Sequence, residues 1–407
     1  MQTLIRYEVN KILRKKSTIV VFVILFLLHI AFVAISGSLG STYVDDKLYE
    51  THYERNQIDR GYGLELSGRK IDDTLLTEMK EVYAKIDKST SAYLWSDIYK
   101  NEVRKYSDID ELFSRYWPVN LVFLYGRFDE KISAEKDLYS VREDYKQQAY
   151  TDYALSDEEQ AYWEKKESKI EVPFTYQYHA AYRSILGGQG LYMICMFITF
   201  FIAVTMVNVF FDEHSRKTDQ LILCTRLGHG KLYTAKILAG SLVTFFVSLL
   251  FVITAILGKF FSYGPEGFEA SIQMLVYWYP YPLSVGETSL IMIVLLLLSS
   301  IMVTIFAMIL AEVLKNNIGA IAIISGIFFA SRLVVIPMQY EFLSHAWKFL
   351  PINMLMLNDG FVDLRLISFF GMELTNWQFA PILYVGLSVF MFFVGNRVYR
   401  NYQVCGR

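Results

Sequence analysis

Long apolar runs and one long polar stretch alternate along this chain of 407 residues. The first apolar run is Thr18–Ile35, and the stretch Gly37–Arg183 that follows it is rich in charged residues and tyrosine. From Leu191 onward the chain is again mostly apolar. Because about 18 or more apolar residues make a helix long enough to cross the hydrocarbon core, the pattern predicts a multi-pass membrane protein. The polar stretch becomes a domain inserted after the first span.

The apolar pattern predicts an all-α membrane protein with six transmembrane helices. The predicted spans are Thr18–Ile35, Leu191–Phe211, Ile237–Leu257, Leu290–Ala311, Ile318–Ile336 and Pro381–Val394. The last run is the shortest. Because a span needs about 20 residues, we expect its helix to begin at or before Phe379. An even number of spans places both chain ends on the same side of the membrane.

Basic residues are concentrated on one side of this six-span arrangement. That side receives the N-terminus, the loop 212–236, the turn 312–317 and the C-terminus. These segments carry Arg6, Lys11, Arg14, Lys15, Lys16, Arg216, Lys217, Arg226, Lys231, Lys236, Lys315, Arg397, Arg400 and Arg407. The short loops on the other side hold only Lys259, Lys348 and Arg365, with Arg332 just inside a span. Since cytoplasmic loops are enriched in Lys and Arg, both termini are expected in the cytoplasm.

The chain therefore divides into five predicted parts. They are a cytosolic basic amphipathic segment (1–17), the first span (18–36), a mostly helical extracellular domain (37–185), spans two to six (186–396) with a cytosolic loop at 212–236, and a cytosolic tail (397–407). The basic flank and first apolar run also fit a secretory signal. However, the apolar part of a signal is typically about 7–15 residues, and this run is longer, so an uncleaved anchor is favoured.

Helical periodicity appears within the inserted domain. Apolar residues recur at helical spacing at Leu75, Leu76, Met79, Val82, Tyr83 and Ile86. Ser156 followed by three acidic residues predicts a helix start, and Pro173 follows its end. No cysteine lies in the insert, so no disulfide can hold it together. Its many tyrosines are interpreted as helix-packing residues, with a ligand-binding surface as the alternative.

Two further apolar segments are too short to span. Leu275–Leu283 and Phe342–Leu355 are rich in aromatic residues, which favour the headgroup level of a membrane. They are predicted to be interfacial helices or re-entrant pieces, and loops packed on the bundle are the alternative.

Catalytic and cofactor motifs do not emerge from the chain. Gly228–Lys231 superficially resembles the end of a phosphate-binding loop, but it lacks the earlier glycine spacing and the hydroxyl residue after the lysine. A net charge of −2 gives no basic field for nucleic acid. His29 is interpreted as a packing residue, and Glu312 and Arg332 as residues that reach the membrane surface. No carboxylate falls in mid-span, which argues against an ion-driven carrier.

The loop 212–236 carries the most informative local pattern. Asp212 and Glu213 open it and suit a helix N-terminus. The apolar residues Leu221, Ile222 and Leu223 follow, and glycines then interrupt the helix before Lys236. A cytosolic helix too short to cross the membrane must bury such residues on a partner or on the membrane surface.

This loop resembles the first cytosolic loop of the permease subunits of type-2 ABC exporters. That loop runs from an acid through Gly-Thr and a leucine-rich stretch to a basic or small break and a lysine entering the third span. The matching residues here are Glu213, Thr218, Leu221, Leu223, Arg226 and Lys236. Lys217 replaces the usual glycine. The basic segment Leu4–Lys16, the six spans and the apolar segment before the last span extend the resemblance over most of the chain.

The resemblance implies a transport pore without its own motor, in the bacterial plasma membrane. Two permease copies, identical or different, would associate, and two ABC ATPase chains would bind from the cytosol and hold ATP and magnesium. Coupling to them would fall on Glu213, Thr218, Leu221, Ile222, Leu223, Arg226 and Lys236. The chain itself would be no enzyme and hold no cofactor or metal. Its apolar spans favour an amphipathic or hydrophobic cargo, such as a peptide, an antibiotic or a lipid-like molecule.

Two hypotheses from other functional classes stay open. The chain could be a membrane receptor or adaptor whose external domain senses a ligand and whose loop docks a signalling partner. A membrane-embedded enzyme is disfavoured because the catalytic residues are missing.

Overall fold

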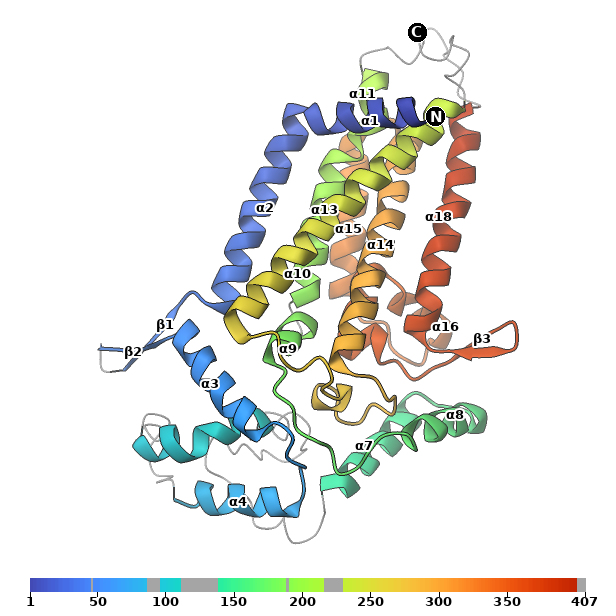
Figure 1. Ribbon diagram of the computed structural model, residues 1–407. Helices are drawn as coiled ribbons and strands as arrows, with labels where there is room; N and C mark the ends of the chain where they lie inside the picture. Colours follow the sequence, from blue (N-terminus) through green and yellow to red (C-terminus); the bar gives the residue numbers. More distant parts are fainter. Residues whose placement is uncertain (45–46, 86–95, 111–137, 188–189, 216–229, 401–407) are drawn as a thin grey trace.

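The computed structural model describes residues 1–44, 47–85, 96–110, 138–187, 190–215 and 230–400 (Figure 1). Within these ranges the chain forms a bundle of long helices with a mostly helical insert at one end (Figure 1). The N-terminus and the end of the last helix lie at the opposite end, which we call the terminal end. The end that carries the insert is called the insert end.

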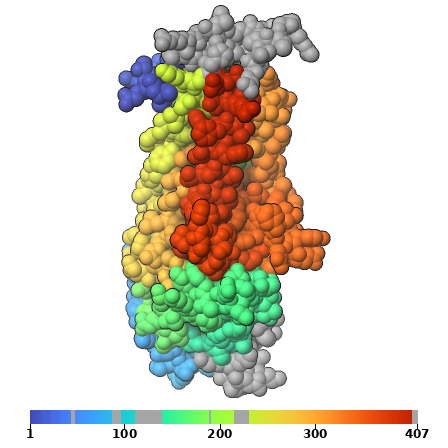
Figure 2. Space-filling view, turned by 90° about the vertical axis from the view of Figure 1, so that its right-hand side faces the viewer, coloured from blue at the N-terminus to red at the C-terminus, as the bar shows by residue number. Residues whose placement is uncertain are grey.

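Five helices in the described ranges are long and apolar enough to cross a membrane. They are α2 (Lys16–Gly37), the continuous stretch Gly190–Glu213 that contains α10 (Gly190–Thr205) and most of α11 (Asn208–Ser215), α13 (Lys231–Tyr263), α14 (Val285–Leu314) and α18 (Asn376–Arg400). Each contains one of the predicted apolar runs. α18 begins before Phe379, as its length required. Figure 2 shows α18 running along one face of the bundle, above α7 and α8 of the insert.

The remaining predicted span is shorter. α15 (Asn317–Leu333) has 17 residues and lies beside α10 and α14 in the bundle (Figure 1). At 1.5 Å per residue it is about 25 Å long, less than the roughly 30 Å of a hydrocarbon core. Asn316 caps its start by accepting a hydrogen bond from the Gly319 amide at 3.2 Å. The six-span count therefore stays a prediction.

Close packing between the long helices depends on small residues and buried polar groups. A Cβ on Gly240 of α13 would lie 2.6 Å from Met308 Sδ of α14, so a larger residue there would require the Met308 side chain to shift. His29 is fully buried, and its Nε2 lies 3.0 Å from the Phe251 carbonyl oxygen. This agrees with its interpretation as a packing residue. Glu312, by contrast, is buried rather than reaching the surface, although Val313 and Leu314 beside it are exposed.

The insert is mostly helical within the described ranges. Its elements include the hairpin β1 (Ser41–Val44) and β2 (Lys47–Thr51), followed by α3 (His52–Leu66), α4 (Asp73–Tyr83), α7 (Leu138–Asp152), α8 (Asp157–Glu167) and α9 (Ala180–Leu186). The periodic residues Leu75, Met79 and Tyr83 form the buried face of α4. Ser156 caps α8 and shares a capping box with Glu159. Both helix predictions are confirmed.

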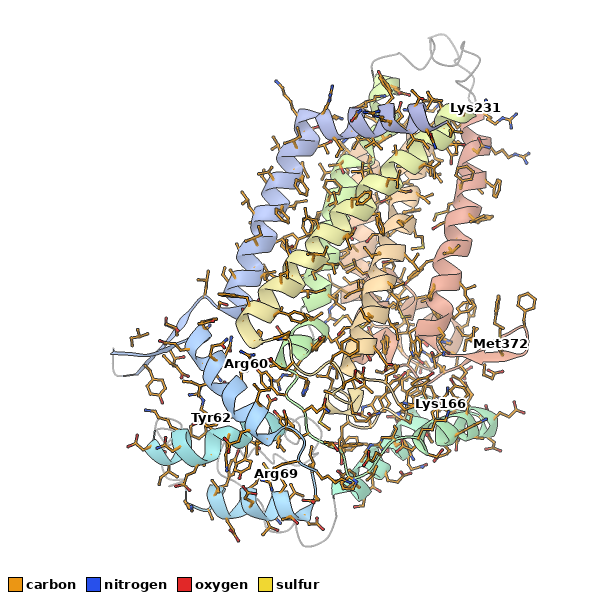
Figure 3. The ribbon with its side chains drawn as sticks, in the orientation of Figure 1. Arg60, Tyr62, Arg69, Lys166, Lys231 and Met372 are labelled. Carbon is orange, nitrogen blue, oxygen red and sulfur yellow. The ribbon has the colours of Figure 1, made fainter. Side chains whose placement is uncertain are left out.

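The insert and the bundle share their cores. The segment between α13 and α14 places Met274 and Tyr277 in the insert's hydrophobic cluster. Arg142 of α7 donates from Nε to the Tyr277 carbonyl oxygen at 2.8 Å. Arg60 of α3 pairs with Glu266 (Figure 3). The predicted interfacial segment Leu275–Leu283 is therefore largely a buried loop, because its aromatic residues pack between the two parts of the protein.

The region before the last helix lies at the insert end. It contains α16 (Glu341–Lys348), α17 (Pro351–Met354) and the hairpin β3 (Ile367–Phe369) and β4 (Met372–Leu374). α16 exposes Phe342 and Leu343 and buries Ser344. This agrees with an interfacial helix in Phe342–Leu355, while α17 packs into the core.

Candidate coupling site at the terminal end

Helix α1 (Gln2–Arg14) lies across the terminal end of the bundle, at a steep angle to α2 (Figure 1). Its two faces differ: Glu8 and Ile12 are buried, while Tyr7 and Leu13 are exposed. A short amphipathic helix of this kind buries one stripe against its neighbours. Here the neighbour is α13, whose first residue, Lys231, lies at the same end (Figure 3).

A buried charge network joins α1 to α11 and α13. Lys236 of α13 is 0% exposed, and its Nζ lies 2.6 Å from Glu213 Oε1 of α11. Lys11 of α1 places its Nζ 2.6 Å from the same oxygen. Lys236 also donates to the Val209 carbonyl oxygen at 3.1 Å and lies over the Phe210 ring. We call Lys11, Glu213 and Lys236 the lysine–glutamate bridge.

Two further contacts surround the bridge. Glu8 is buried on α1, with its Oε2 3.8 Å from Lys11 Nζ. Lys15 Nζ lies 2.5 Å from Asp212 Oδ2 in a partly exposed pair. Burial disfavours the charged form of Lys11, but the hydrogen bond and the charge of Glu213 outweigh it and raise the Lys11 pKa. The ammonium group therefore stays charged at neutral pH.

A local break in the second long helix places Glu213. α10 ends at Thr205 and α11 resumes at Asn208, whose Nδ2 donates to the Val204 carbonyl oxygen at 2.6 Å. Asp212 and Glu213 lie within α11, past its first turn, not at a helix N-terminus as predicted. Lys11, Lys15 and Lys236 pair with these two carboxylates.

The structure describes two of the seven predicted coupling residues. Glu213 and Lys236 lie 2.6 Å apart, although 22 residues separate them in the chain. The other five, Thr218, Leu221, Ile222, Leu223 and Arg226, lie outside the described residues. Sequence reasoning missed the roles of Glu8 and Lys11. The signal that could have found them is their spacing of three residues, which places both on one face of an amphipathic segment.

The charges at this site hold three helices together. In the described part of the chain, no group of three or more His, Cys, Asp or Glu residues could hold a metal ion. A desolvated ion pair costs several kcal/mol per charge unless its partners stay in place. The bridge therefore fixes α1, α11 and α13 relative to one another at the two ends of the loop 212–236.

Comparison with known families identifies the chain. The model of the ABC-2 family transporter proteins matches residues 2–358 of the 407. No curated protein and no solved structure matches it significantly. The family implies a transporter that works in a lipid bilayer with ABC ATPase partners. The chain therefore belongs to the ABC-2 family of transporter proteins, as a multi-pass membrane subunit that is not itself catalytic.

Proposed function

We propose that this chain is the permease subunit of an ATP-driven exporter in the bacterial plasma membrane. It moves an amphipathic or hydrophobic cargo out of the cytoplasm, and the separate ATPases that bind ATP and magnesium dock on the loop 212–236. The observation that carries the proposal is the lysine–glutamate bridge, which ties both ends of that loop to α1. A displacement of the loop by an ATPase would reach α1, α11 and α13 together.

Apolar residues in the loop provide the docking surface in this proposal. Burying one leucine side chain fully is worth about 1.5–3 kcal/mol. Leu221→Ser is therefore expected to weaken ATPase binding by roughly tenfold to a hundredfold. The measurement is the amount of ATPase that co-purifies with the tagged permease from native membranes, followed by an equilibrium titration of the purified subunits.

Val313→Ser is the matched control. Val313 is an exposed apolar residue near the end of α14, at the terminal end but outside the loop. It should leave ATPase binding unchanged. If Leu221→Ser binds the ATPase as well as the wild type does, the loop only rests on the membrane and the docking proposal fails.

The proposed orientation places the insert outside the cell and the terminal end inside. Ser140 and Glu158 are exposed on the insert, and Asn10 and Asn316 are exposed at the terminal end. In a cysteine-free background, Ser140→Cys and Glu158→Cys should react with a membrane-impermeant thiol reagent in intact cells. Asn10→Cys and Asn316→Cys should react only after permeabilisation. Labelling of Asn10→Cys in intact cells would show that the orientation is the reverse of the proposed one.

The proposed assembly contains two permease copies, identical or different. Large apolar side chains on α2 and α18, such as Leu27, Phe390 and Phe393, are exposed and available for contact with lipid or with a second copy. Cross-linking of differently tagged copies in membranes would detect the pair.

A cavity in the insert favours a sensory role as the second candidate function. It has a volume of about 640 Å³, and its lining includes Tyr178, Arg104 and Asp59. The Tyr178 hydroxyl is buried and has no hydrogen-bond partner among the described residues. Buried polar groups usually have partners, so a ligand could supply one. A permease that co-purifies with a kinase and no ATPase would favour this role over export.

A further inference from the structure

A groove at the insert end lies between the insert and the last helix. It has a volume of about 840 Å³, within the roughly 300–1,000 Å³ of small-molecule sites. The turn after α7 and the first turn of α8 form one wall, and α16 forms another. The first two turns of α18 contribute Phe379 and Leu383. All residues that line it belong to segments other than the coupling site.

Much of the lining of the groove is apolar. It includes Met338, Phe342, Phe349, Phe379 and Leu383. The Phe349 and Phe379 rings contact edge to face, with centroids 5.7 Å apart. These side chains offer apolar surface to a hydrocarbon chain.

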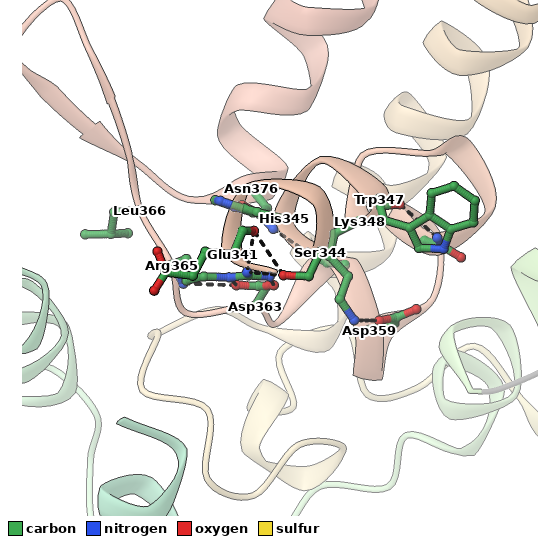
Figure 4. A network of polar contacts seen from close by, with 12 residues as sticks. Glu341, Ser344, His345, Trp347, Lys348, Asp359, Asp363, Arg365, Leu366 and Asn376 are labelled. Carbon is green, nitrogen blue, oxygen red and sulfur yellow. Dashed lines mark hydrogen bonds and ion pairs between the residues drawn. The ribbon is translucent and has the colours of Figure 1, made fainter. Parts of the chain in front are cut away.

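The charged part of the lining is mostly acidic. It contains Asp152, Glu159 and Glu341, together with the guanidinium group of Arg365 and the imidazole of His345. The charge of Arg365 is compensated by Asp363, because its Nε donates to Asp363 Oδ1 at 2.9 Å. Its Nη1 also donates to Ser344 Oγ at 2.9 Å (Figure 4). The lining therefore keeps an excess of negative charge.

Exposed apolar residues lie on α16 and on the segments that precede and follow the groove's lining residues in the chain. Phe342 is 87% exposed, Val335 is 85% exposed and Phe370, at the tip of the β3–β4 hairpin, is 89% exposed. Contiguous exposed apolar residues mark interaction surfaces, and aromatic side chains favour the membrane interface. Such residues favour a place at the membrane surface for this end of the molecule.

We propose that this groove binds a cationic amphiphile at the membrane surface on the insert side. The chain of the amphiphile lies against Phe349, Phe379 and Leu383, and its positive head lies beside Glu341 and Asp152. The inference deepens the proposed export function, on which its meaning as a cargo site rests. Binding itself needs no ATPase, because every lining residue belongs to this chain at the end away from the loop 212–236.

The test uses the full-length permease in nanodiscs of phosphatidylcholine. The probe is a dodecyltrimethylammonium analogue with a photoreactive diazirine in its chain. We expect cross-links on α16 and the first turns of α18. Unlabelled dodecyltrimethylammonium should compete with the probe, and dodecyl sulfate should compete far less. Equal competition by both, or cross-links spread evenly over all lipid-facing helices, would overturn the proposal.

The role of the acidic lining residues is tested by the double variant Asp152→Asn with Glu341→Gln. Both residues are exposed, so their replacement should leave the fold intact. Labelling is expected to fall roughly three- to tenfold, as for the loss of two surface charge interactions. The matched control is Asp157→Asn with Glu158→Gln, which removes two exposed acids of α8 outside the groove and should change nothing.

The two proposals fail separately. Unchanged labelling in the Asp152→Asn and Glu341→Gln variant overturns the cationic site, whatever the ATPase does. If the wild-type permease binds no ATPase, the export proposal is overturned. The measured preference of the groove for a cationic amphiphile would still hold.

Discussion

Replacing Glu213 by leucine is expected to lower the free energy of unfolding by about 3–5 kcal/mol, the cost of leaving a buried charge unpaired. Lys236 is 0% exposed, and its remaining direct contacts would be the Val209 carbonyl oxygen and the Phe210 ring, with the Glu8 carboxylate acting on it at longer range. Neither supplies the negative charge that Glu213 places 2.6 Å away. Thermal unfolding of the purified full-length chain, followed by tryptophan fluorescence, measures the change.

The double variant Glu213→Leu with Lys236→Met separates an unpaired charge from lost packing. Replacing both partners of a buried pair by apolar residues of similar size is often neutral or stabilising. Lys11 is partly exposed and can reach water once Glu213 is gone. We therefore expect the double variant to recover most of the stability that the single variant loses. If both variants are equally destabilised, the charge pairing does not account for the effect.

Asp212→Asn is the control for the loss of a charge on the same helix. It breaks a pair with Lys15 in which both side chains are about one-third exposed. Such a pair contributes about 0–1 kcal/mol. A loss as large as that of Glu213→Leu would show that any disturbance of α11 is destabilising.

The double variant also tests coupling. It should reach the membrane and bind the ATPase, because the apolar residues of the loop are unchanged. Without the bridge, however, α1 is no longer tied to α11 and α13. ATP hydrolysis should then continue while cargo transport falls.

The positions of the long helices follow from the sequence because a span is defined by length and apolarity alone. The end of α15 shows the limit of that rule. The apolar run continues to Ile336, but the helix stops at Leu333 and Val334 is extended. Pro337 follows, and the residue before a proline avoids the helical region. The proline signal therefore outweighs the apolar pattern over the last residues of the run.

The coupling site could be predicted only in part. The loop pattern selected Glu213 and Lys236, but no local rule connects two residues 23 positions apart. Their contact depends on α13 starting at Lys231, which places Lys236 in its second turn facing α11. The segment at Tyr277 shows a similar limit. Aromatic residues suit both a membrane interface and a buried loop, and only the packing of the insert decides between them.

The attachment of the insert to the bundle depends strongly on Trp163 of α8. Its side chain is fully buried, and its Nε1 donates to the Leu364 carbonyl oxygen at 2.7 Å. Its ring also contacts Tyr279, with centroids 5.8 Å apart. One side chain thus joins the insert to the segment before α14 and to the segment before α18.

Trp163→Ala is expected to lower the free energy of unfolding by about 3–5 kcal/mol, the range for removing a large buried aromatic residue. Trp163→Phe keeps most of the ring but leaves the Leu364 carbonyl oxygen without its donor, which costs about 1–3 kcal/mol. Thermal unfolding should rank the variants in that order, and limited proteolysis of the alanine variant should cut within the insert first. Equal stability of the wild type and the alanine variant would mean that the insert is held by its other contacts, such as the bond from Arg142 to Tyr277.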